Sequence, residues 1–143
     1  MAMNEQLNVV AGVIQLSVAP VFLLTGIGAL LGVMTQRLAR IVDRARAVEI
    51  DPAGSRGPDE LAQLGERAHW IHRAITLCVV AALLVCAVIV GLFVTAYYAW
   101  SPDLAKAVAT VFAAAMLALI GGLLAFLREV QIATAVLRFG PRT

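Results

Sequence analysis

Three blocks of apolar residues, separated by segments rich in charge, dominate the pattern along the chain. They run from about residue 7 to 35, from 74 to 99 and from 104 to 127. A helix needs roughly 20 apolar residues to cross a bilayer, and each block exceeds that length. The sequence therefore predicts an all-α membrane protein with three transmembrane helices.

Helical periodicity continues past the first block and precedes the second. Apolar residues keep helical spacing from Leu38 to Ala45 and again from Leu61 to Ile71. Two prolines and two glycines between Asp51 and Pro58 separate these stretches. We therefore expect spans 1 and 2 to extend into a cytosolic helical hairpin over about residues 36–73. Arg128 and Glu129 are expected to end the third span, leaving a tail over 128–143 and a single membrane domain over 1–143.

Composition supports the membrane assignment, and the basic residues predict an orientation. The chain is 62% hydrophobic and 14% charged, whereas soluble domains carry about 25% charged residues. Ten basic residues lie between spans 1 and 2 or after span 3, and only Lys106 lies on the other side. Because basic residues flank the cytoplasmic ends of spans, the N-terminus is expected outside and the C-terminus in the cytoplasm. A net charge of +2 does not indicate a nucleic-acid partner.

Two charged motifs carry a resemblance to a known family. They are the segment Arg-Leu-Ala-Arg-Ile-Val-Asp-Arg at Arg37 to Arg44 and the pattern Leu-x-x-Arg-Ala at Leu64 to Ala68. With the adjoining spans, over roughly residues 13 to 95, the chain resembles a bacterial family of small integral membrane proteins named domain of unknown function 2721. The resemblance implies a multi-pass protein of the bacterial cytoplasmic (inner) membrane and implies no activity.

One side of the first helix and its extension combines polar, small and basic residues. At 100° per residue, its members fall within about 40° of Gln15. They are the pore-lining candidates Asn8, Gln15, Phe22, Gly26, Val33, Arg37, Arg40 and Arg44. If several copies surround an axis, Phe22 and Val33 form apolar constrictions and the arginines form a basic ring. The alternative is that the outer residues face lipid or another helix and the arginines lie among the headgroups.

Small residues mark two helix-packing surfaces. Gly28 and Gly32 form a Gly-x-x-x-Gly pair on the opposite side of the first helix. A second set lies on one side of the third span: Ala114, Ala118, Gly121 and Ala125. Such surfaces allow close approach of another helix, which belongs either to the same chain or to a second copy.

The charged residues of the hairpin indicate no catalytic or metal site. Glu66, His69 and His72 recur on successive turns of one helix, but carboxylate metal sites draw further acids from other helices. Glu66 is instead expected to reach across the hairpin to an arginine. No nucleophile and base pair or phosphate-binding loop is present, so we expect neither an enzyme nor a cofactor.

Two functions remain open from the sequence. The first is a homo-oligomeric inner-membrane protein with channel-like character, which passes ions or small solutes along an axis lined by span 1. The second is a non-conducting scaffold or interaction protein whose basic hairpin binds anionic lipid or a protein partner. Membrane lipids and further copies of the chain are the expected partners in both.

Overall fold

The computed structural model describes three long helices, over residues 2–50, 58–97 and 102–137. They are α1 (Ala2–Ile50), α2 (Pro58–Tyr97) and α3 (Pro102–Leu137). All three are long and apolar enough to cross a membrane, and the described residues contain no strand. The all-α membrane architecture predicted from the sequence is confirmed.

Local chemistry accounts for where α2 and α3 begin. Pro58 and Pro102 occupy the first helical positions, where a missing N–H removes no hydrogen bond and the fixed φ suits a helix. Acidic side chains follow in each first turn, Asp59 and Glu60 in α2 and Asp103 in α3. These charges favour the positive end of the helix dipole.

The helices are longer than the apolar blocks within them. α1 has 49 residues, which at 1.5 Å per residue gives about 73 Å, against about 30 Å for the hydrocarbon core of a bilayer. α3 passes through Arg128 and Glu129 and ends only at Leu137. The third helix therefore continues beyond the predicted end of the apolar block at residue 127, and no Gly or Pro lies between Glu129 and Leu137 to stop it. The predicted end of span 2 at Ala99 and the last residues of the tail lie outside the described residues.

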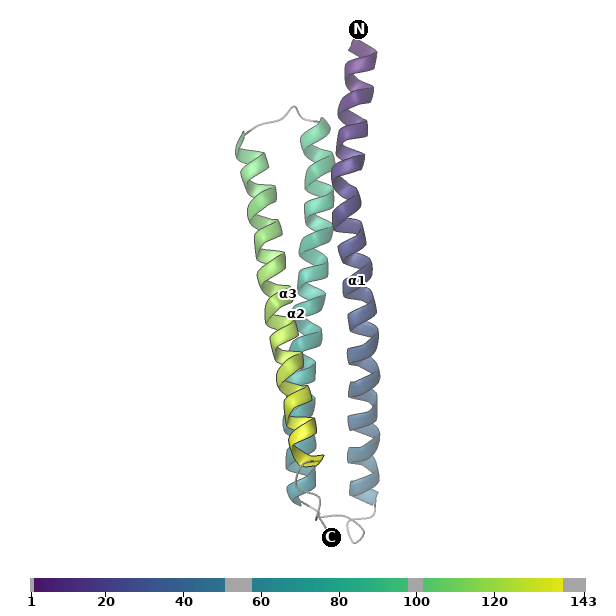
Figure 1. Cartoon of the computed structure of the whole chain (residues 1–143), viewed down its shortest axis with the longest axis vertical. Coiled ribbons are helices and arrows are strands. Elements are labelled where there is room, and N and C mark those ends of the chain that lie inside the picture. Colours follow the sequence, from purple (N-terminus) through teal and green to yellow (C-terminus); the bar gives the residue numbers. More distant parts are fainter. Residues whose placement is uncertain (1, 51–57, 98–101, 138–143) are drawn as a thin grey trace.

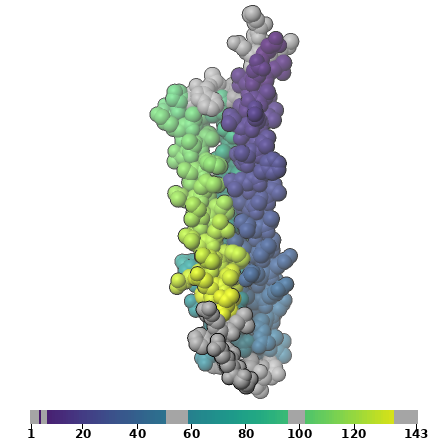
Figure 2. Space-filling model, viewed as in Figure 1, coloured from purple at the N-terminus to yellow at the C-terminus, as the bar shows by residue number. Residues whose placement is uncertain are grey.

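α2 is the central helix of the bundle and packs along both α1 and α3. Figure 1 shows α1 antiparallel to α2, with its N-terminal end projecting past the last turn of α2 and the first turn of α3. α3 leans toward α1 at the opposite end, where the space-filling view shows the two helices in contact (Figure 2). We call this end, where α1 and α3 finish and α2 starts, the arginine-rich end.

A seven-residue repeat of buried side chains joins α1 to the bundle. Its members are Val13, Pro20, Ile27, Met34, Ile41 and Val48, all buried and all seven residues apart. α2 buries two such series, one containing Ile71, Cys78 and Val85 and the other Ala74, Ala81 and Val88. A sustained repeat of this length is typical of left-handed coiled-coil packing. α1 therefore attaches along one side, through this seam and the half-buried residues beside it, and the opposite side of the helix is exposed.

Candidate functional site

The arginine-rich end is held together by a buried carboxylate that receives one arginine from each of the other two helices. The Glu129 side chain on α3 is 0% exposed. Arg67 on α2 donates to Glu129 Oε1 at 2.9 Å, and Arg37 on α1 donates to Oε2 at 3.4 Å. Since burial of an unpaired carboxylate is very unfavourable, these two arginines make the position of Glu129 tolerable.

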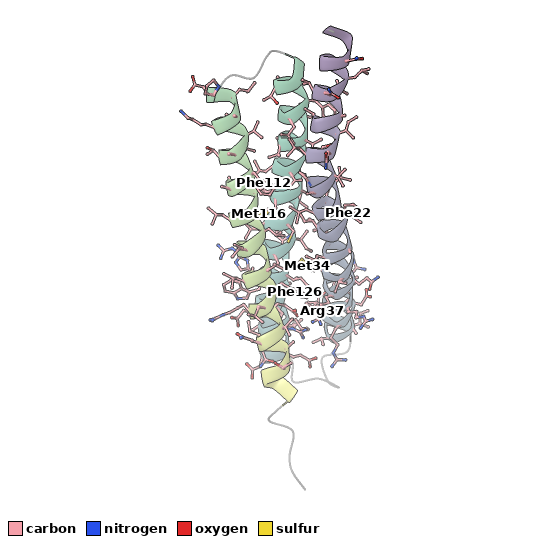
Figure 3. All side chains as sticks on the ribbon, turned by 45° about the horizontal axis from the view of Figure 1, so that its top comes forward. Phe22, Met34, Arg37, Phe112, Met116 and Phe126 are labelled. Atoms are coloured by element: carbon pink, nitrogen blue, oxygen red, sulfur yellow. The ribbon has the colours of Figure 1, made fainter. Side chains whose placement is uncertain are left out.

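Packing along α3 brings the carboxylate to this position. Glu129 lies seven residues after Gly122, and both are buried on the side of α3 that packs against the bundle. One turn earlier, the Phe126 ring lies 5.3 Å from the guanidinium carbon of Arg37 (Figure 3). The aromatic face and the carboxylate together hold Arg37 between α1 and α3.

A groove between α1 and α2 collects the arginines of both helices. It has a volume of about 310 Å³ and is lined by Arg37, Arg40, Arg44 and Arg67 with Ile41 and Leu64. We call it the four-arginine groove. Arg44 also donates to Glu60 across the hairpin at 2.8 Å. Among the described residues, no carboxylate lies within ion-pair distance of Arg40.

The charges around the groove do not cancel. Four arginines line it, and two carboxylates, Glu60 and Glu129, pair with three of them. A net charge of about +2 therefore stays at a surface where guanidinium groups have donors to spare. An anion with several oxygen acceptors, such as a phosphate group, matches this arrangement.

The structure separates the pore-lining candidates into two groups. Asn8, Gln15, Phe22, Gly26 and Val33 are all exposed along α1, and the Phe22 side chain, a large apolar group, is exposed at 73%. The three arginines lie together at the groove, where Arg37 turns toward α3. Sequence reasoning had placed these three on one face but had missed Arg67 and Glu129, which complete the cluster from other helices.

The predicted packing residues also divide. A side chain at Gly28 or Gly32 would meet nothing within 4 Å, so this pair packs against no helix of the same chain. On α3, Ala125 is buried, Ala118 and Gly121 are half-buried and Ala114 is exposed. The tightest contacts of this kind are at Gly122 and Gly91, where an added Cβ would lie 2.8 Å from Cys78 Sγ and from Val108 Cγ2. Neither glycine was predicted.

Glu66 forms no ion pair with any arginine in the described part of the hairpin. The carboxylate that reaches across the hairpin is Glu60, which lies opposite Arg44. His69 lies edge-on to Trp70, with ring centres 6.4 Å apart. Among the residues that the structure describes, no three His, Cys, Asp or Glu side chains are grouped to hold a metal ion.

Comparison with known proteins identifies a family. The family model described as "Protein of unknown function (DUF2721)" matches residues 17–139. No curated protein and no solved structure matches the chain. The matched region includes the four-arginine groove, Glu129, the second and third apolar blocks, and the first block from residue 17 onward.

Proposed function

We propose a function for this chain, which belongs to the DUF2721 family, as a membrane interaction protein that binds anionic lipid headgroups through its arginine-rich end. The proposal places the chain in a bacterial inner membrane, with its N-terminus outside and its arginine-rich end in the cytoplasm. Ten of its eleven basic residues are on that side of the spans, and the positive-inside rule supports this orientation.

The four-arginine groove is the observation that carries the proposal. Its arginines come from two helices that are fixed against each other by the buried seam, so the donors are preorganised. Arg37 lies two residues after the first apolar block, which supports a position of this end of the groove at headgroup level. Each basic residue near an anionic membrane surface contributes about 1 kcal/mol to binding.

The distribution of acids along the hairpin supports the same assignment. Four of the six acids of the hairpin lie near its tip, and four of its seven arginines lie near the apolar blocks: Glu49, Asp51, Asp59 and Glu60 at the tip, and Arg37, Arg40, Arg67 and Arg73 at the base. The positive charge is thus concentrated at the base of the hairpin, close to the headgroups. Lipid, rather than a ligand that approaches from the cytoplasm at the tip, is the anion best placed to meet it.

Removal of the unpaired arginine tests the proposal. In Arg40→Gln we expect affinity for phosphatidylglycerol to fall about fivefold, because one surface cation is lost. Bound lipid is counted by native mass spectrometry of the full chain, with phosphatidylcholine as the uncharged comparison. Arg46→Gln is the matched control, since Arg46 is exposed on the same helix and does not line the groove. Equal affinities in the wild type and Arg40→Gln would contradict the assignment.

A homo-oligomer with channel-like character is the second candidate, and Gln15 favours it. Gln15 is exposed, yet its neighbours Val13 and Ser17 are buried against the bundle, so it lies beside the apolar part of the helices. No hydrogen bond joins its amide to any described side chain or backbone group. An amide in this position can form hydrogen bonds if it faces water or a second copy of the chain, whereas lipid chains offer none.

Substitution on the exposed glycine side tests assembly. In Gly28→Ile and Gly32→Ile together, we expect the particle mass in detergent to fall, because bulky side chains block close approach of another copy. The fold of one chain should persist, since neither glycine contacts it. A wild-type mass of one chain would contradict this candidate. If an oligomer forms, Gln15→Leu should alter any conductance measured in a planar bilayer.

A further inference from the structure

A second groove lies between α2 and α3 and shares no residue with the four-arginine groove. Its volume is about 770 Å³, and both helices contribute to its walls. Its two ends differ in chemistry. Trp70, Arg73 and Arg128 form one end, and Leu77, Gly121 and Leu124 form the other. Because the lining changes from cationic to apolar along one direction, the groove fits a ligand that changes in the same way.

The cationic end places two guanidinium groups on one indole ring. The guanidinium carbon of Arg73 lies 5.9 Å from the Trp70 ring centre, and that of Arg128 lies 5.7 Å from it. Contact with the ring face holds the two cations but leaves their N–H groups available for hydrogen bonds. No described carboxylate pairs with either arginine, and His69 and His72 also line this end. Two adjacent cations without an acid are suited to an anionic group.

The apolar end continues into the spans. Arg73 immediately precedes the second apolar block, and Arg128 immediately follows the third. Leu77 and Leu124 therefore lie on the bilayer side of the arginines. Gly121 leaves room between them because it has no side chain. A Cβ added at this position would lie 3.4 Å from Leu77 Cδ1. A hydrocarbon chain that leaves a headgroup at the arginines would run along this apolar wall.

We propose that this groove binds one phospholipid with an anionic headgroup, its phosphate between Arg73 and Arg128 and one acyl chain beside Leu77 and Leu124. The volume is within the range of sites that enclose a ligand of drug-like size, which is enough for a headgroup and the upper part of one chain. Free phosphate would leave the apolar end unused. Trp70 also fits this position, since tryptophan favours the membrane interface. The proposal shares the membrane setting and the class of lipid with the proposed function, but it stands on a separate groove whose lining residues are different.

Fluorescence of Trp70 tests the proposal at the site itself. The chain has two tryptophans, so Trp100→Phe leaves Trp70 as the only indole. This variant is reconstituted in phosphatidylcholine vesicles that contain phosphatidylglycerol brominated near the top of its acyl chains. We expect stronger quenching than with brominated phosphatidylcholine at the same mole fraction. The preference should fall about fivefold in Arg128→Gln and in Arg73→Gln.

Three comparisons separate the possible results. Arg46→Gln and Arg40→Gln should keep the preference, because neither residue lines this groove. Loss of the preference in Arg40→Gln would overturn the assignment to this groove. By contrast, an unchanged affinity of Arg40→Gln for phosphatidylglycerol in native mass spectrometry would contradict only the assignment to the four-arginine groove. Equal quenching by the two brominated lipids would also overturn the proposal. So would an equal change of Trp70 emission produced by inorganic phosphate alone. Helical circular dichroism verifies that each variant is folded.

Discussion

Replacing Arg67 with alanine is expected to destabilise the bundle by about 3 kcal/mol, the scale of breaking a buried ion pair by removing one partner. The Glu129 side chain is 0% exposed, and Arg67 provides its shorter contact, at 2.9 Å. Without Arg67, the carboxylate keeps only Arg37 at 3.4 Å. Thermal unfolding of the purified protein in detergent, followed by circular dichroism, measures the loss.

The order of the variants identifies the cause. Glu129→Gln should cost less than Arg67→Ala, because the two arginine side chains are 42% and 26% exposed and can hydrate. Arg67→Ala combined with Glu129→Gln should recover part of the stability lost in Arg67→Ala, since no buried charge remains. Arg46→Ala, at an exposed position, is the control for loss of a charge. A Glu129→Gln variant less stable than Arg67→Ala would contradict the account.

Replacing either of two glycines with alanine is expected to change the stability of the bundle in opposite directions. In Gly122→Ala the new Cβ would lie 2.8 Å from Cys78 Sγ and 3.2 Å from the Ala74 carbonyl oxygen. α2 and α3 must then separate, at a cost of about 1–3 kcal/mol, as for other overpacked interiors. Gly65→Ala meets nothing within 4 Å and should stabilise α2 by about 0.5–1 kcal/mol, because alanine restricts the unfolded chain and favours helix.

The same unfolding measurement compares the two glycine variants. Gly65 is the matched control because it belongs to the same pair of packed helices and receives the same substitution. A lower midpoint for Gly122→Ala together with an unchanged or higher one for Gly65→Ala is the expected result. A Gly122→Ala protein as stable as the wild type would mean that α2 and α3 adjust without loss at this contact.

The helices were predictable from the sequence because length and apolar content decide them. Which side of α1 packs against the bundle was harder to predict from the sequence. A projection at 100° per residue drifts away from a seven-residue repeat over a helix as long as α1. Counting in sevens from Val13 passes through Ile27, Met34 and Ile41, which is the seam. It includes Pro20, which is buried in the seam although proline is not expected inside a helix.

The candidate site was predictable only in its α1 part. Arg37, Arg40 and Arg44 share a side of one helix, which spacing alone can identify. Glu129 was interpreted only as marking the end of the third span, because its charge was considered without its position on the helix. Its place seven residues after Gly122 and fourteen after Ala115 assigns it to the buried side of α3. The contribution of Arg67 depends on how two helices meet and has no local signal.

The buried seam of α1 continues from the lipid-embedded part of the helix into the part that is surrounded by water. Its upper side chains lie among acyl chains, where burying an apolar group against a helix gains little because lipid is equally apolar. Ile41 belongs to the same core as Leu64 and Ile71 beyond the apolar blocks, where burial from water contributes about 25 cal/mol per Å². The extended hairpin therefore tethers the first span at high effective concentration beside the second. Association of helices inside the bilayer is thus secured largely from outside it.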